Sequence, residues 1–364
     1  MRRTLGWIAG ALALFGALIA APLAHAAVLK GDCPDGYQVK AGLNTDFPHK
    51  GEKRAFVVYP AENPDGTPLK GPAPLWVPLT GSVESTIANL TVARSGANSL
   101  MAKEGFTVVG PVRQCANQDP NLGGGVCNGP GHDGWNWNPW REGRAGGPTG
   151  EAFKTDEGPD STFFIALARC VAKSFPLDAK RLYLGGISSG GTMTNRALTF
   201  RSDFWAGGLP ISGEWYVTKD DGVGMAFNDA RAYVAANPDK VLQGRVGPYP
   251  MPKKLGPMIV ITVWGGPKDL WDCGPPLGLC SDYRPTTQAG SNYFSSMPNV
   301  VHVACTAGHG HMWPQANTQA FNAWALKTLA SHPKGAEPKA FKLTPPPEGY
   351  ACKLGRFTDH YPQS

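Results

Sequence analysis

The sequence lacks the short motifs that mark nucleotide-binding and zinc-binding proteins. No glycine-rich turn ends in G-K-[ST] or has the spacing of a dinucleotide fingerprint, which argues against a phosphate-binding loop. No C-x-x-C pair occurs, so the eight cysteines do not have the spacing of a zinc site. Internal repeats are absent as well. These absences argue against phosphate-binding, zinc-stabilised and repeat proteins.

Charge and long hydrophobic runs are also scarce. The formal net charge of +6 falls to +4 without Arg2 and Arg3, and no block of Lys and Arg is present, which argues against a nucleic-acid partner. The one long apolar run, Ile8 to Ala21, follows those two arginines and precedes the small-residue cleavage site Ala24-His25-Ala26. We therefore expect residues 1–26 to be a signal peptide and the mature chain to be periplasmic or secreted, without a membrane anchor.

Glycine and proline, in contrast, are abundant. The 46 glycines and 34 prolines cluster between apolar segments, which indicates one large domain with long loops. We expect a single domain over residues 27–364, with insertions at about 115–158 and 213–255 and an extended C-terminal tail from about 333.

All eight cysteines lie after the expected signal peptide, and an even count in an oxidising compartment predicts disulfides. Their connectivity cannot be deduced from the sequence. The simplest pairings are Cys115 with Cys127 and Cys273 with Cys280, which would leave Cys33 with Cys352 and Cys170 with Cys305.

Apolar strand patterns alternate with helical ones. Helical periodicity is found at 161–175 and 318–331, and the elbow described below leads into a helix-compatible stretch. This alternation predicts an α/β fold, a mostly parallel sheet with helices on both faces. The expected strands are Arg54–Tyr59, Leu75–Leu79, Phe106–Pro111, Arg181–Gly185, Gly207–Ile211, Met258–Trp264 and Val300–Cys305.

The most informative motif follows the expected strand at 181–185. Gly186-Ile187-Ser188-Ser189-Gly190 has the form of a nucleophile elbow, a strained strand-to-helix turn that exposes a serine hydroxyl. The positions two before and two after the serine must lack bulk, which Gly186 and Gly190 satisfy. Ser188 is therefore the expected nucleophile.

An acid and a base follow in the chain order that this architecture requires. Asp269 comes directly after the strand 258–264 and is the expected acid, with Asp272 as its rival. Three histidines compete for the role of base: His302 lies within a strand, His309 could form a metal pair with His311, and His311 is the expected base. No metal or other cofactor is expected.

Several segments carry a resemblance to a known family. The elbow with its Met-Thr extension, Trp135-Asn136-Trp137 and His311-Met312-Trp313-Pro314 resemble the polyhydroxybutyrate depolymerase and feruloyl esterase branch of the α/β-hydrolases. Within that branch, the mature chain is most similar to the oxidized polyvinyl alcohol hydrolases, which are bacterial β-diketone hydrolases. The segments of this closer match are Val112–Cys115, Asp133–Trp140, Ser212–Tyr216 and Val263–Gly266.

The resemblance implies a serine hydrolase that cleaves a carbon–carbon bond of β-diketones through an acyl-enzyme. The backbone N–H of Ser189 and that of Ser82 or Val83 would form the oxyanion hole, because Thr80-Gly81-Ser82-Val83 stands where many esterases have His-Gly. The alternatives are a carboxylesterase or polyester depolymerase and, more remotely, a non-catalytic surface binding protein.

Tryptophans accompany the acid and base segments. Trp264, Trp271 and Trp313 could wall a cleft for an oxidized polymer or a small diketone or ester, whereas the tract 135–140 fits core packing equally well. The insertion at 213–255 is the expected lid. No partner protein can be named from the sequence.

Overall fold

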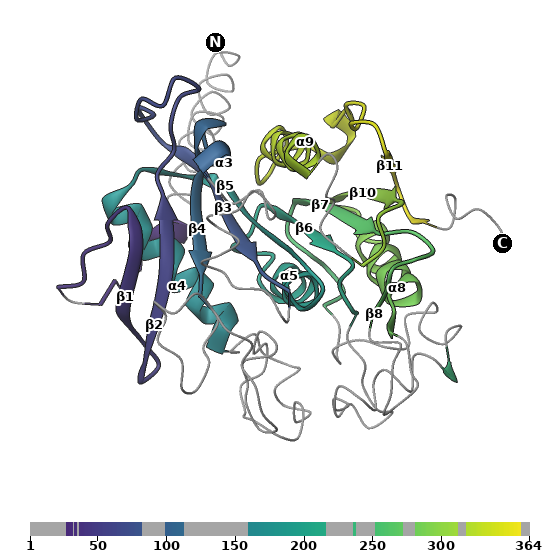
Figure 1. The fold of residues 1–364 in the computed structure, drawn as a ribbon, viewed down its shortest axis with the longest axis horizontal. Helices are drawn as coiled ribbons and strands as arrows, with labels where there is room; N and C mark the ends of the chain where they lie inside the picture. The colour runs from purple at the N-terminus through teal and green to yellow at the C-terminus, as the bar shows by residue number, and fades with distance from the viewer. Residues whose placement is uncertain are drawn as a thin grey trace, which may run out of the picture.

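The computed structural model describes residues 27–31, 33, 34, 36–81, 99–112, 159–215, 236, 237, 252–271, 281–311 and 318–357. A nine-stranded sheet runs through the molecule (Figure 1). Its strands are β1 (Gly42–His49), β2 (Glu52–Tyr59), β3 (Ala73–Leu79), β4 (Thr107–Pro111), β5 (Leu177–Ile187), β6 (Gly207–Ile211), β7 (Met258–Trp264), β10 (Val300–Ala307) and β11 (Tyr350–Leu354).

The strands are arranged in the order β1-β2-β4-β3-β5-β6-β7-β10-β11. The six from β4 to β10 are parallel to one another, while β1, β2 and β11 add antiparallel edges. Every residue of β4, β6 and β7 is buried, because helices cover both faces of the parallel part. The carboxyl ends of β5, β6, β7 and β10 therefore lie next to one another along one edge.

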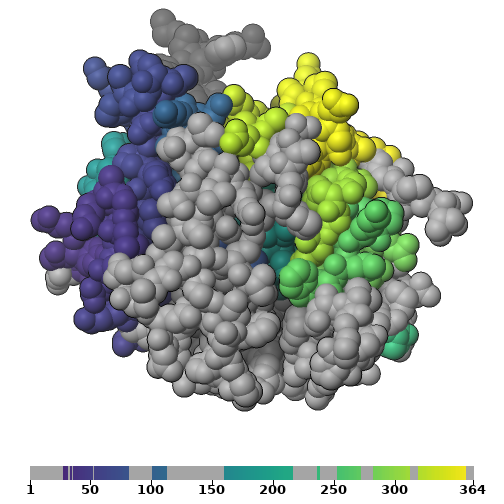
Figure 2. All heavy atoms as spheres, in the orientation of Figure 1, coloured from purple at the N-terminus to yellow at the C-terminus, as the bar shows by residue number. Residues whose placement is uncertain are grey.

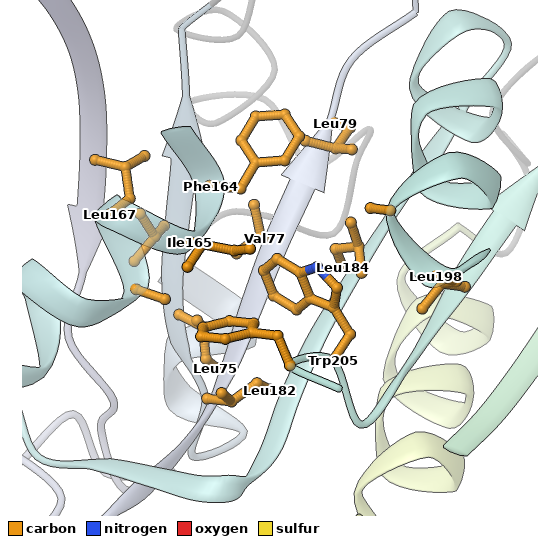
Figure 3. Packing of buried hydrophobic residues seen from close by; sticks show 14 of the residues in the cluster. Leu75, Val77, Leu79, Phe164, Ile165, Leu167, Leu182, Leu184, Leu198 and Trp205 are labelled. Atoms are coloured by element: carbon orange, nitrogen blue, oxygen red, sulfur yellow. The ribbon is translucent and has the colours of Figure 1, made fainter. Parts of the chain in front are cut away.

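In the described residues, five α-helices pack on the sheet. Residues of α4 (Pro159–Ser174), α5 (Ser189–Phe200) and α8 (Tyr283–Ser295) contribute to one buried cluster, and residues of α3 (Ser99–Lys103) and α9 (Thr318–Ala330) contribute to another. In the first cluster, Leu75, Val77 and Leu79 of β3 lie against α4 and against Leu184 and Trp205 (Figure 3). The fold is the expected α/β layering, with a core on each face of the sheet.

All seven strands expected from the sequence are present, with small differences at their ends. The helices expected at 161–175 and 318–331 correspond to α4 and α9. The sequence did not indicate β1, α3, α8, β11 or the two-stranded ribbon of β8 (Leu270–Trp271) and β9 (Ser281–Asp282). The insertion expected at about 115–158 lies outside the described residues, and of the one expected at 213–255 the structure describes 213–215, 236, 237 and 252–255.

Two disulfides differ from the pairings considered above. Cys33 is bonded to Cys170 and Cys305 to Cys352, so the pairings Cys33–Cys352 and Cys170–Cys305 are wrong. The sheet explains the second bond, because Cys305 and Cys352 are direct partners in the antiparallel pairing of β10 with β11. The other four cysteines lie outside the described residues.

The C-terminal tail expected from about 333 contains a strand. It passes a short 3₁₀ turn at Pro338–Ala340 before β11 completes the sheet. Figure 2 shows these last residues, in yellow, beside the yellow-green residues of α9, and the Tyr350 ring stacks on Phe321 of that helix. In the part of the chain that is described, no helix has the length and apolarity needed to cross a membrane.

Candidate active site

The nucleophile elbow is formed at the junction of β5 and α5. Ser188 has φ 55° and ψ −121°, a backbone conformation that non-glycine residues rarely adopt. A Cβ added at Gly186 or Gly190 would overlap the carbonyl oxygen of Leu79 on β3. Only glycine therefore fits at the two positions that the sequence pattern requires. The Ser188 N–H donates to the carbonyl of Ile211, the last residue of β6, at 3.0 Å.

Asp269 lies in the turn after β7 and its side chain is fully buried. Its Oδ1 is 2.8 Å from Nδ1 of His311. Its Oδ2 accepts the Ser212 hydroxyl at 2.7 Å and the Gly265 N–H at 2.8 Å. Three donors thus surround this carboxylate, as the burial of a charged group requires. The rival residue Asp272 lies outside the described residues.

His311 follows β10 and is brought to Asp269 by a backbone contact. The Gly310 N–H donates to the carbonyl of Gly265 at 2.8 Å, and Gly310 has φ 73°, which favours glycine. Because the ionised carboxylate only accepts, Nδ1 of His311 carries the proton and Nε2 is left as the basic nitrogen. Ser188, Asp269 and His311 follow β5, β7 and β10 along the same edge of the sheet.

Aromatic rings flank the His311 imidazole. Tyr283, the first residue of α8, stacks on it with ring centroids 4.0 Å apart and an interplanar angle of 17°. The Tyr283 N–H also donates to the Asp269 carbonyl at 3.2 Å. Trp271 lies at a centroid distance of 5.5 Å from the imidazole and is 40 % exposed. The His311 imidazole therefore packs on the ring face of Tyr283, and the exposed indole of Trp271 lies nearby.

The other two histidines have different environments. His302 is buried, donates from Nδ1 to the carbonyl of Gly355 and accepts the Thr262 hydroxyl at Nε2, and burial lowers its pKa to about 4. His309 donates from Nδ1 to the carbonyl of Gly310, and burial lowers its pKa. Within the described residues, His311 is hydrogen-bonded to Asp269, whereas His302 and His309 are not.

The remaining predicted site residues are placed as follows. Ser189 opens α5, so its backbone N–H lies at a helix N-terminus beside the nucleophile. Trp264 is only 3 % exposed and packs with Ala304 and Phe357, which favours a core role over substrate contact. Ser82, Val83 and Trp313 lie outside the described residues.

Sequence reasoning missed Ser212 and Tyr283. A signal for Ser212 was present, since it is the polar residue that directly follows the buried strand β6. For Tyr283 no signal existed, because it is distant from His311 in the sequence and reaches it only through the fold.

Comparison with known proteins agrees with this architecture. Residues 144–253 match the family model described as the prolyl oligopeptidase family. The crystal structure of native pOPH is 69% identical, covers 92% of this chain and 100% of that one, and superposes with a TM-score of 0.79. A structure of a serine-to-alanine pOPH variant with pNPB gives the same TM-score at 68% identity, with 92% and 99% of the two chains covered.

Two curated relatives extend over nearly the whole chain. An oxidized polyvinyl alcohol hydrolase from Pseudomonas sp. is 69% identical over 336 residues, which are 92% of this chain and 87% of the relative. A second one, from Sphingopyxis sp. (strain 113P3), is 64% identical over 361 residues, which are 99% of this chain and 97% of the relative. With such identity over almost its full length, the chain belongs to the oxidized polyvinyl alcohol hydrolase family.

Proposed function

We propose that this protein hydrolyses the carbon–carbon bond between the two carbonyl groups of β-diketones in oxidized polyvinyl alcohol, giving a carboxylate and a methyl ketone. The observation that carries the proposal is the identity of 64–69% to relatives named for that substrate. In this reading Ser188 is the nucleophile, His311 the base and Asp269 the acid. The His311–Asp269 hydrogen bond of 2.8 Å supports these roles.

The first half-reaction forms an acyl-enzyme. Nε2 of His311 takes the Ser188 proton while Oγ adds to one carbonyl carbon of the diketone. The backbone N–H of Ser189, with that of Ser82 or Val83, stabilises the oxyanion. Asp269 holds the imidazole in the required tautomer and stabilises the imidazolium that forms.

Collapse of the tetrahedral intermediate breaks the carbon–carbon bond. The electron pair leaves as an enolate delocalised over the second carbonyl, and the His311 imidazolium returns its proton to carbon, which yields the methyl ketone. Water, deprotonated by the same imidazole, then attacks the acyl-enzyme and releases the carboxylate and Ser188. No cofactor takes part in these steps.

The substrate chain needs an apolar surface beside the base. Leu270 and Trp271 form the short strand β8 and are 41% and 40% exposed, although the Trp271 ring contacts His311. Exposed large apolar side chains next to a catalytic residue favour contact with a hydrocarbon backbone. We assign this contact to Trp271, and we propose Trp313 as a second wall, whereas Trp264 is buried in the core.

Ester hydrolysis is the second activity that we propose. The same acyl-enzyme forms from an ester, with an alkoxide as the leaving group. The structure of the pOPH variant with pNPB favours this for the relative, and the shared serine chemistry extends it to this chain as a side activity.

Export from the cytoplasm is also part of the proposal. The expected signal peptide at 1–26 supports it, and so do the disulfides Cys33–Cys170 and Cys305–Cys352, because such bonds persist in oxidising compartments. Amino-terminal sequencing of the protein recovered from the periplasm or the medium is expected to begin at Ala27. A mature protein that retains Met1 in the cytoplasm would contradict export.

Product analysis tests the reaction itself. The mature protein is incubated with acetylacetone-type diketones, oxidized polyvinyl alcohol, short p-nitrophenyl esters and feruloyl esters. We expect equimolar carboxylate and methyl ketone from the diketones, and no product with Ser188→Ala, since removal of a triad member costs several orders of magnitude in rate. Turnover of esters with no cleavage of diketones would overturn the proposal in favour of an esterase.

A further inference from the structure

Ser212 has an unusual backbone and a fully buried side chain. Its φ of 44° makes it one of four non-glycine residues with positive φ in the described part of the chain, and Ser188 is another. Such a conformation costs free energy, and it persists where the surrounding structure or the function demands it. The hydroxyl of Ser212 donates to Oδ2 of Asp269 at 2.7 Å.

The position of Ser212 in the sheet links the nucleophile to the acid. It follows β6, which lies between β5 and β7, the strands that lead to Ser188 and to Asp269. Its N–H donates to the carbonyl of Val263 on β7 at 2.9 Å. The residue before it, Ile211, accepts the N–H of Ser188 at 3.0 Å. One dipeptide thus contacts both neighbouring strands at the catalytic edge.

The crossing of α5 over this segment leaves little room for the backbone to relax. A Cβ added at Gly191 would meet the Ile211 carbonyl oxygen at 2.6 Å and the Cα of Gly213 at 2.8 Å. The chain around Ser212 is therefore fixed by close backbone packing on one side and by β7 on the other. Under these constraints the positive φ points the hydroxyl at the carboxylate.

We propose that Ser212 is a positioning residue for the Asp269–His311 pair, and that its strained backbone is retained for this purpose. The proposal rests on the function proposed above. With the Ser212 hydroxyl and the Gly265 N–H on Oδ2, the Oδ1 atom is directed at Nδ1 of His311. Without the hydroxyl, the carboxylate keeps one donor on Oδ2 and can rotate away from the imidazole.

Two substitutions separate positioning from stability. Ser212→Ala and Ser212→Gly both remove the hydroxyl, but glycine adopts positive φ without strain. We expect both variants to lose kcat by the same factor, about 10- to 100-fold, which is the range for a hydrogen bond to a charged group. The KM should change little in both variants, while Ser212→Gly unfolds at a higher temperature than Ser212→Ala.

Matched controls use other serine and positive-φ positions. Ser291→Ala removes a buried serine hydroxyl that contacts the Phe357 N–H, and Lys50→Gly relaxes a φ of 49° in the exposed turn before β2. Both are expected to keep the wild-type kcat. The proposal would be overturned if Ser212→Gly kept the wild-type kcat. It would also be overturned if Ser212→Ala, which unfolds at the lower temperature, lost more kcat than Ser212→Gly.

Assays on two substrates distinguish failure of the Ser212 proposal from failure of the diketone proposal. Each variant is assayed on a diketone and on a p-nitrophenyl ester. Wild-type protein that hydrolyses the ester alone would contradict the diketone proposal, yet the Ser212 comparison would still be decided on the ester. Normal diketone cleavage by the wild type together with an unimpaired Ser212→Ala would contradict the positioning role alone.

Discussion

At the scale of single residues, the hydrogen-bond partners of two neighbouring histidines distinguish their roles. His311 donates from Nδ1 to the Asp269 carboxylate, whereas His309 donates from Nδ1 to the backbone carbonyl of Gly310. Only His311 is therefore oriented by an anion that can stabilise an imidazolium. His309 lies beside Tyr350 and serves the packing of the loop.

We expect His311→Ala to lower kcat by at least about 1,000-fold, because the serine then has no base. His309→Ala should reduce kcat by less than about 10-fold, since it removes packing and no proton acceptor. Steady-state kinetics on a diketone, with circular dichroism to verify folding, checks both. A larger loss in His309→Ala than in His311→Ala would reverse the assignment of the base.

Tyr283 provides a second prediction at this scale. Its ring stacks on the His311 imidazole, so removing the ring frees the imidazole to rotate. Tyr283→Leu should lower kcat by about 2- to 13-fold, in line with an aromatic pair worth about 0.5–1.5 kcal/mol. Tyr283→Phe keeps the stack and is expected to retain more activity than the leucine variant. Equal activity in the wild type and Tyr283→Leu would show that the stack does not position the base.

The placement of individual site residues was predictable only where chain order and strand ends carried the information. Ser188, Asp269 and His311 each follow an apolar strand, and the fold brings all three strand ends to one edge. Tyr283 reaches His311 through α8, and the Ser212 contact depends on a backbone angle. No local sequence pattern predicts the Tyr283–His311 stack or the Ser212–Asp269 hydrogen bond. Both contacts therefore become evident only in the three-dimensional structure.

At the scale of secondary-structure elements, the edge strands β1 and β11 and the helix α8 were not predicted from the sequence, for different reasons. β1 contains Pro48 and a register shift between Asn44 and Phe47, which interrupt its alternation. β11 has only five residues and none of them is buried. α8 contains Pro285 and Gly290 and buries threonines and serine, so its helical face is polar. The buried parallel strands, in contrast, have continuous apolar sequences, which is why they were predicted.

The disulfide of the edge strand supplies the element-scale prediction. Cys305 and Cys352 close a loop with a sequence separation of 47 residues, for which restriction of the unfolded chain contributes about 4 kcal/mol. The double variant Cys305→Ala/Cys352→Ala should lose a comparable part of its free energy of unfolding. Urea denaturation of the oxidised proteins measures this. No change in the denaturation midpoint would exclude a stabilising role for the bond.

At the scale of the whole molecule, His302 joins several elements. Its imidazole contacts Thr262 on β7, Ser295 on α8 and Gly355 after β11. Burial lowers its pKa to about 4, from 6.5 for the exposed group. The unfolded chain therefore binds a proton more tightly than the folded one between these two values.

It follows that stability is fully present above pH 6.5 and falls as the pH drops towards 4. His302 alone accounts for on the order of 3 kcal/mol of this loss. Urea unfolding at several pH values should show the decrease, with a shallower slope for His302→Gln. Some slope remains in that variant, because burial also lowers the pKa of His309 and His332. A wild-type free energy of unfolding that is constant from pH 6.5 to 4 would contradict this account.

The place of β11 in the sheet also has a consequence for truncated forms of the protein. Among the described residues it is the final strand, and it pairs with β10, whose end leads directly to His311. A protein cut before Tyr350 would keep Ser188, Asp269 and His311 but would lose the partner strand of β10 and the Cys305–Cys352 bond. The hydrogen-bonding groups along β10 would then form an open sheet edge, and open edges pair with other chains. Proteolysis between α9 and β11 would therefore favour aggregation of a chain that still contains all three residues.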